Sequence, residues 1–412
     1  MQLKKSILLF LSIFSITVIA VGQNLRVQSK DTVNGKPSWD AYLYFKMKLN
    51  GVFDISGGLQ GQETFNIHNI DIWGTDDTPN LWMDLHQSQL RLYGAKEVGN
   101  HTAVGYFEGD FWGGNNHFRL RMAYINYHFF QFGQDWSFFG DKEIWPNVFD
   151  WDGPPSGVWR RNPGLMFFPI NNNRWRLDVG FEHTQAQISF VDDLDSTFQK
   201  ASGNPTPESI VAIKKMGNFG HIRLSGLLRF LHYKENNQMG YVPAYGFSLS
   251  GFLKTHKEKV NPIQFQLVAG TGIASYLVSF DGAQYDAIPN GYGDINTLPA
   301  AGGWVSYEHW FGKMWHGNIV LGSTIFKSFE LSDYYVPAAD LEVSEGSVDL
   351  KYIYALINLM VDPFKDFTVG IEYNIGQKQN VYKGKFNGSD QNDELIKDRI
   401  AQRISFGLFY NF

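Results

Sequence analysis

The sequence predicts an all-β fold, namely a transmembrane antiparallel β-barrel with a constriction loop folded into its lumen. Three observations predict it. Segments of alternating apolar and polar residues recur along the 412-residue chain. The last such segment ends on an aromatic residue, Phe412. The connections between segments are very unequal in length, as in outer-membrane barrels, where short periplasmic turns alternate with longer extracellular loops.

The chain begins with the features of a cleaved signal peptide. Lys4 and Lys5 precede an apolar run over residues 7–21, and the small residues at 20–22 suit a cleavage site. A transmembrane helix needs about 20 apolar residues, more than this run offers. We therefore expect residues 1–22 to be a signal peptide, residues 23–38 a short N-terminal segment, and residues 39–412 an outer-membrane β-barrel.

The clearest alternating segment covers residues 366–376, where Phe367, Val369 and Ile371 alternate with polar or small residues. Successive residues of a strand point to opposite faces, so this segment has one apolar and one polar face. The same pattern appears over residues 40–50, 174–182, 221–230 and 399–412. Such strands suit a barrel whose outer face meets lipid and whose inner face is wet.

The connections add the second part of the pattern. Residues 361–365 predict a tight turn, because Pro363 interrupts an apolar segment there. We expect long polar loops over residues 192–209, 281–301, 328–347 and 377–397. At roughly 24 residues for a strand and its connection, the mature chain predicts about 16 strands, the size class of porins.

The composition limits the class of protein. The chain contains no cysteine, which excludes disulfides, thiolate metal sites and a catalytic cysteine. Phe, Trp and Tyr make up 16% of the residues, which suits the aromatic girdles of a barrel. The formal net charge of -6 argues against nucleic-acid binding, which needs a basic face.

Residues 133–168 contain the densest cluster of chemically distinctive side chains. Pro146, Pro154 and Pro155 lie within it, and proline at this density cannot sustain a strand ladder. We therefore expect a loop over residues 138–160. In a porin-sized barrel such a loop can fold inward and narrow the lumen.

Charged residues of both signs accompany this loop. Asp150 and Asp152 lie within it, and Arg160 and Arg161 follow at its end. One interpretation is a constriction with facing acidic and basic rims that selects solutes by charge. The other is an ordinary loop whose Asp and Arg residues pair at the surface.

Arginines on the polar faces of strand-like segments form the second candidate constellation: Arg91, Arg119, Arg121, Arg174, Arg176, Arg223 and Arg229. A charge facing lipid at mid-membrane costs roughly 2–4 kcal/mol, so these side chains should face the lumen or an interface. Guanidinium groups bind carboxylates and phosphates bidentately, which favours anionic solutes. Alternatively, they neutralise wall carboxylates such as Glu108, Asp110, Asp178 and Glu182 without selecting anything.

The candidate residues for solute binding at the constriction are Arg119, Arg121, Arg160, Arg161, Arg174, Arg176, Asp150 and Asp152. No motif indicates an enzyme. The glycines of Gly270-Thr271-Gly272 are not followed by a helix, as a nucleotide loop would require. His309 lacks the second histidine of a zinc helix, and no spacing singles out a Ser–His pair. We expect no catalysis, no metal and no cofactor.

The chain resembles the DcaP-like porins, and more loosely the phosphate- and pyrophosphate-selective porins. The segments that carry this resemblance are LHQSQL at 85–90, FEGDF at 107–111, RLRMAY at 119–124, GQDWSFF at 133–139, FDWDGP at 149–154 and RRNP at 160–163, with later fragments at 270–276, 309–310 and 358–373. Gln89 stands where the family pattern commonly has arginine. The resemblance as a whole covers most of the mature sequence.

The resemblance implies a sixteen-stranded barrel, usually a homotrimer, that passes small negatively charged solutes through an arginine-lined constriction. It makes Arg119, Arg121, Arg160 and Arg161 the eyelet or wall charges. We therefore expect a passive diffusion channel in the outer membrane of a Gram-negative cell, with dicarboxylates or phosphorylated compounds as solutes and outer-membrane lipid as its surroundings. The alternative is a structural or adhesive barrel with a closed lumen, whose long loops bind a partner or glycan.

Overall fold

The structure is a computed structural model that describes residues 25–33, 35–59, 63–74, 77–189, 198–201, 203–256, 261–289, 295–327, 331–336 and 341–411. The predicted signal peptide lies outside the described residues. No helix within the described part of the chain is long and apolar enough to cross a membrane.

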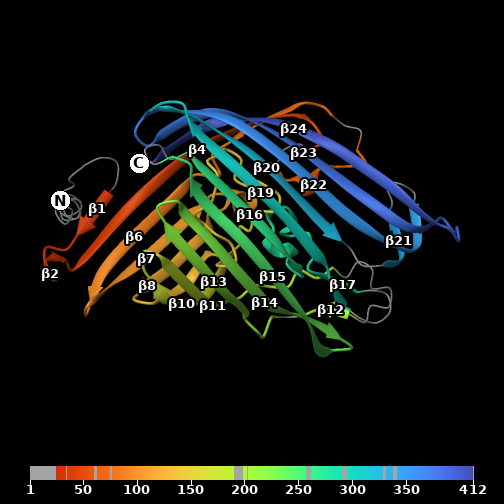
Figure 1. Cartoon of the computed structure of the whole chain (residues 1–412), viewed down its shortest axis with the longest axis horizontal. Coiled ribbons are helices and arrows are strands. Elements are labelled where there is room, and N and C mark those ends of the chain that lie inside the picture. Colours follow the sequence, from red (N-terminus) through yellow and green to blue (C-terminus); the bar gives the residue numbers. More distant parts are fainter. Residues whose placement is uncertain are drawn as a thin grey trace, which may run out of the picture.

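Sixteen antiparallel strands form the wall of a closed barrel (Figure 1). In order around the wall they are β4 (Trp39–Ser56), β6 (Gln89–Val98), β7 (His101–Asp110), β8 (Arg119–Tyr127), β9 (Phe130–Trp136), β10 (Arg161–Asn171), β11 (Trp175–Glu182), β13 (Glu208–Gly217), β14 (Gly220–Glu235), β15 (Gln238–Lys254), β16 (Pro262–Thr271), β19 (Pro299–Trp310), β20 (Trp315–Lys327), β22 (Leu341–Phe364), β23 (Phe367–Phe386) and β24 (Asn392–Asn411). The last strand pairs with the first, with Leu408 opposite Leu49, and this pairing closes the ring. The predicted all-β barrel is confirmed.

Shorter strands and turns accompany the sixteen wall strands. Four strands pair at its margins, namely β1 (Leu25–Gln28) and β5 (Asn80–Asp84) with β4, β12 (Phe198–Lys200) with β14, and β21 (Leu331–Val336) with β22. Two small hairpins join β2 (Thr32–Val33) to β3 (Lys36–Pro37) and β17 (Ala287–Pro289) to β18 (Ile295–Thr297). The 3-10 turns are η1 (Ile67–Asn69), η2 (Gly114–Asn116), η3 (Ala274–Tyr276) and η4 (Val278–Phe280).

The two faces of each wall strand follow the predicted alternation. In β24, Ala401, Arg403 and Ser405 are buried toward the interior, whereas Ile400 is 48% exposed on the outer surface. Large apolar side chains are exposed in the same way on many wall strands, for example Phe181, Leu224, Phe247, Leu267, Leu321, Ile357 and Ile371. A closed barrel with this apolar outer surface is an outer-membrane protein, because lipid contact accounts for an apolar belt that water would not stabilise.

The connections divide between the two ends of the barrel as predicted. Short turns at one end include residues 99–100, 128–129, 218–219 and 365–366, whereas the opposite end carries the long segments 57–79, 137–160, 183–207 and 272–298. The turn predicted over residues 361–365 lies slightly later, at Lys365 and Asp366, where Asp366 takes a left-handed conformation (φ 64°). Pro363 is accommodated within β22 because it lies at a break in the pairing with β23.

The long loop predicted over residues 377–397 is wrong. These residues form the ends of β23 and β24, and only residues 387–391 connect them. Both strands remain paired throughout this stretch, for example with Val381 opposite Ile396. Their polar composition, which suggested a loop, belongs to strands that carry polar residues on both faces. Within the loop predicted over residues 328–347, β22 likewise begins at Leu341.

A hydrophobic core lies inside the barrel, formed by three connections that fold inward from the loop-bearing end. They are the described parts of residues 57–79, 137–160 and 272–298. Their buried apolar residues form one cluster that includes Leu59, Phe65, Ile67, Phe139, Val148, Val158, Tyr276, Leu277 and Phe280. The lumen is therefore largely filled by these segments, and the space that remains between them and the wall defines the candidate site.

Candidate functional site: a charged cavity in the lumen

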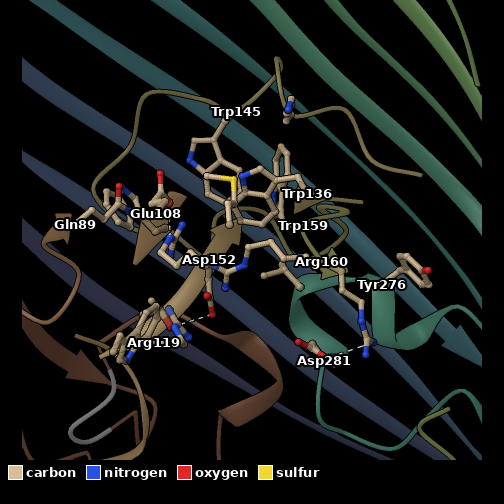
Figure 2. A pocket seen from close by; sticks show the side chains of 18 of the residues that line it. Gln89, Glu108, Arg119, Trp136, Trp145, Asp152, Trp159, Arg160, Tyr276 and Asp281 are labelled. Atoms are coloured by element: carbon tan, nitrogen blue, oxygen red, sulfur yellow. Dashed lines mark hydrogen bonds and ion pairs between the residues drawn. The ribbon is translucent and has the colours of Figure 1, made fainter. Parts of the chain in front are cut away.

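A cavity of about 490 Å³ lies between the inward loops and the wall strands β4 to β10 (Figure 2). Its lining contains seven cationic side chains, namely Lys46, Arg91, Arg119, Arg121, Lys142, Arg160 and Arg161. It contains three acidic ones, namely Glu108, Asp152 and Asp281. The formal charge of the lining is therefore positive, although the whole chain is acidic.

The loop at residues 137–160, which we call the constriction loop, is held to the wall through its own backbone. Arg223 on β14 donates hydrogen bonds to the carbonyl oxygens of Phe138 and Gly140, and Ser225 donates to Phe139 O at 2.6 Å. Near the far end of the loop, Gln266 on β16 accepts the N–H of Val158 at 3.0 Å. These contacts satisfy buried backbone groups that have no strand partner.

Further anchors hold the middle of the constriction loop on the opposite part of the wall. Glu372 on β23 accepts the backbone N–H groups of Phe149 and Asp150 at 2.9 and 3.0 Å. Lys48 on β4 donates to Phe149 O at 2.6 Å. The loop therefore crosses the interior from β14 to β4, so that the prediction of an inward-folded loop is confirmed.

Arg160 and Arg161 lie where the constriction loop joins β10. Together with Trp159 and Asp281 they line the cavity described above and also a second cavity of about 460 Å³. The lining of the second cavity also includes His183, the first residue after β11. These four residues therefore form the boundary between the two spaces.

The two arginines at this boundary have different partners. Arg160 donates to Ser275 O at 2.8 Å and to Asn162 Oδ1 at 3.2 Å, and it lies 3.6 Å from Asp281. No residue that the structure describes forms a hydrogen bond or ion pair with the guanidinium of Arg161, which lies 4.9 Å from the ring centre of Trp136. Arg161 is thus a cation without a neutralising partner in the described part of the cavity.

Three wall arginines are paired instead. Arg119 binds Asp110 bidentately at 3.0 and 2.8 Å. Arg121, which is 8% exposed, contacts Glu108 at 2.7 Å and Asp110 at 3.0 Å, and Arg91 contacts Glu108 at 2.9 Å. For these wall arginines, the interpretation that they neutralise wall carboxylates describes the contacts well.

The other candidates from the sequence have separate positions. Asp152 lines the cavity and accepts a hydrogen bond from Thr64 at 2.9 Å, whereas Asp150 is buried and accepts the backbone N–H of Phe65. Arg176 pairs with Asp178 at 2.6 Å and lines a smaller side pocket. Arg174 is exposed in the turn between β10 and β11. The structure thus brings Arg119, Arg121, Arg160, Arg161 and Asp152 together, but not Asp150, Arg174 or Arg176.

Besides Thr64 and Asn66 of the connection at residues 57–79, the sequence reasoning missed two larger contributors to the cavity. The first is the connection at residues 272–298, whose Ser275, Tyr276 and Asp281 line the cavity. The second is a set of indole rings that lines the same cavity: Trp112, Trp136, Trp145, Trp151 and Trp159. Four of these tryptophans lie within the segment already singled out at residues 133–168, so their density there was the available signal.

The carboxyl groups of the constriction loop do not titrate like exposed ones. Burial is the main cause that raises the pKa of Asp152 to about 7, and repulsion from Asp150 adds to this rise. The hydrogen bond from Thr64 opposes it. Removal from water likewise raises the pKa of Asp150. Low dielectric surroundings disfavour the charged form of an acid, so the charge of Asp152 changes near neutral pH.

One group of side chains has the composition of a metal site. Ligand atoms of Glu63, Asp84 and His86 lie within 4.8 Å of one another. His86 Nδ1 and Glu63 Oε1 are already 2.6 Å apart and form a hydrogen bond. These three residues could hold a divalent cation through nitrogen and oxygen ligands, but they lie outside the set of residues that lines the cavity.

No protein-family model and no curated protein matches this chain. Solved structures do match. The outer-membrane channel DcaP of Acinetobacter baumannii is 17% identical with a TM-score of 0.66, covering 94% of this chain and 100% of that one. An anion-selective porin from Comamonas acidovorans is 10% identical with a TM-score of 0.54, covering 91% and 100%. A trimer form of OmpT from Vibrio cholerae is 10% identical with a TM-score of 0.50, also covering 91% and 100%. At these identities the chain shares the fold of these outer-membrane proteins, including the DcaP fold expected from the sequence.

Proposed function

We propose that this protein is an outer-membrane porin through which small anionic solutes diffuse passively past Arg160 and Arg161. The observation that carries the proposal is the position of these arginines at the boundary of two cavities. A solute that moves between the cavities has to pass their guanidinium groups. Passive diffusion needs no cofactor, because the solute moves down its own gradient.

The charge of the cavity supports a preference for anions. Its lining carries seven cationic and three acidic side chains, and the Arg161 guanidinium is available for a carboxylate or phosphate. Guanidinium groups match both of these anions in geometry. Dicarboxylates and phosphorylated compounds fit this chemistry. Binding has to stay weak enough for the solute to leave.

Two further points belong to the same proposal. The anion selectivity in the name of the Comamonas porin and the trimer form of OmpT support an anion-selective homotrimer for this chain. The filled lumen, with its core of three inward connections, favours the alternative of a closed barrel that binds a partner or glycan through its loops. Single-channel recordings separate the two, because a closed barrel would pass no steady ion current.

We expect the double variant Arg160→Ala with Arg161→Ala to lower the chloride-over-potassium permeability ratio. One unit charge about 4 Å from an ion is worth about 1 kcal/mol in water, so that the ratio should fall roughly fivefold or more. The measurement is the reversal potential in a planar bilayer under a salt gradient. Arg174→Ala is the matched control, since it removes one arginine from an exposed turn. An unchanged reversal potential in the double variant would reject the boundary role.

We expect the anion preference to rise as the pH falls from 8 to 6. Asp152, whose pKa is about 7, is charged above this interval and neutral below it, so the cavity becomes more positive as the acid is protonated. Reversal potentials at several pH values test this. Asp152→Asn should remove most of the change. Equal pH dependence in both proteins would contradict the assignment to Asp152.

A further inference from the structure

Three tryptophans of the cavity form one continuous aromatic wall. The ring centres of Trp145 and Trp159 are 4.0 Å apart, and the ring of Trp136 lies 6.2 Å from the first and 6.4 Å from the second. Figure 2 shows these indoles gathered on one side of the pocket, next to Arg160. All three side chains are only partly buried, so part of each ring faces the open space.

The indoles of this wall differ in what covers them. Arg161 lies over Trp136 at 4.9 Å, and Lys46 lies over Trp151 elsewhere in the cavity at 4.9 Å. Among the described residues, no cation is found over Trp145 or Trp159. Their rings therefore offer an apolar surface whose electron-rich face attracts weakly positive C–H groups.

Polar groups of two kinds border the same space. The guanidinium of Arg161 is a donor without an acidic partner among the described residues. The carboxylates of Asp152 and Asp281 provide acceptors, and Figure 2 shows Asp152 below the indoles. A ligand that satisfies both kinds of group needs an acid function and several hydroxyl donors.

We propose that the cavity binds sugar acids, that is, hexuronates or short acidic oligosaccharides, as they pass through the barrel. The inference rests on the proposed function, because it names the solute class of the same pathway. The C–H face of a pyranose ring packs on the Trp145–Trp159 surface, its carboxylate binds Arg161, and its hydroxyls donate to the acceptors. A cavity of about 490 Å³ lies within the usual range for small-molecule sites.

An aromatic acid fits this cavity less well. It could stack on the indoles and bind Arg161, but it has no hydroxyl groups to donate to Asp152 and Asp281. The carboxyl group of Asp152 would lose water without a replacement, and an unsatisfied buried polar group is costly. A neutral sugar has the opposite deficit, because it leaves Arg161 without an anion. The combination of ring, acid and hydroxyls therefore distinguishes the sugar acid.

The test measures how added solutes interrupt the chloride current of single channels in a planar bilayer. We expect sodium glucuronate to interrupt the current at a concentration at least about fivefold below that needed for glucose or sodium benzoate. Trp145→Ala and Trp159→Ala should each weaken the glucuronate effect by about five- to tenfold, the loss typical of one removed stacking contact. Trp159→Phe, which keeps an aromatic face, should retain most of it.

The control is Trp315→Ala, which removes an exposed tryptophan from the outer surface at the start of β20. It should leave the glucuronate effect unchanged. A chloride-selective channel that responds equally to benzoate and glucuronate would overturn the sugar-acid inference but leave the porin proposal standing. Equal glucuronate responses in wild type and Trp159→Ala would also overturn it. A barrel that passes no current would overturn both.

Discussion

Removing Arg223 and Glu372 together is expected to release the constriction loop and raise the single-channel conductance. These two side chains bind four backbone groups of the loop. Arg223 lies on β14 and Glu372 lies on β23, and five other wall strands lie between these two strands. A hydrogen bond to a charged group contributes about 1.5–3 kcal/mol. Removing both anchors leaves the loop with Lys48, Glu182 and several neutral contacts, among them those of Ser225, Gln266 and Asn358.

The variant to make is Arg223→Ala with Glu372→Ala, compared with each single substitution. Conductance in the double variant should exceed that of the wild type, and proteolysis within residues 137–160 should be faster because the loop opens locally. Arg174→Ala serves as the control for the loss of one arginine. A double variant with wild-type conductance and a protected loop would show that the remaining contacts hold the loop in place unaided.

The wall of the barrel could be predicted because its physical rule is local. Each strand in lipid needs one apolar face, and the alternation of residues such as Ile400 and Phe406 with Ala401 and Arg403 records that need directly. The constriction loop was visible for a similar reason, since its prolines exclude a ladder. The rule fails where a strand has polar residues on both faces. The strand ends within residues 377–397 are paired, but their polar residues lie on both faces, so the sequence resembles a loop.

The contents of the lumen could not be predicted in the same way. Residues 281–301 were predicted as a long polar loop, and the inward position of the connection depends on contacts made in the folded barrel, such as Val158 with Leu277 and Arg229 with Gly272 O. Arg223 and Arg229 were expected to face the lumen, which they do, but both are fully engaged by loop backbone and buried acids. Alternation gives the direction of a side chain, whereas its partner depends on which loop lies opposite. The unpaired state of Arg161 is therefore a property of the folded interior alone.

Replacing Arg229 with alanine is expected to destabilise the protein more than any other single change at an arginine described above. Its side chain is completely buried and contacts Glu208 at 2.7 Å and Asp286 at 3.1 Å. It also donates to Gly272 O at 2.7 Å, at the start of the third inward connection. Both carboxylates are themselves fully buried. Removing the cation leaves two buried acids without a positive charge to balance them. Breaking a buried ion pair in this way costs about 3–5 kcal/mol.

Thermal unfolding of the detergent-solubilised barrel, followed by circular dichroism, measures this loss, with Arg174→Ala as the control for an exposed arginine. A second variant separates charge burial from packing: Arg229→Met combined with Glu208→Gln and Asp286→Asn removes the cation and both acids while keeping similar volume. Because the desolvation of the three charged groups disappears together with their attraction, this triple variant should recover much of the stability that Arg229→Ala loses. If instead Arg229→Ala unfolds at the wild-type temperature, the cluster contributes little to the fold, and residues 272–298 are held in the lumen by apolar packing of Leu277 and Phe280. If the triple variant is as unstable as the single one, the hydrogen bond to Gly272 O, which both variants lack, is the main contribution of Arg229.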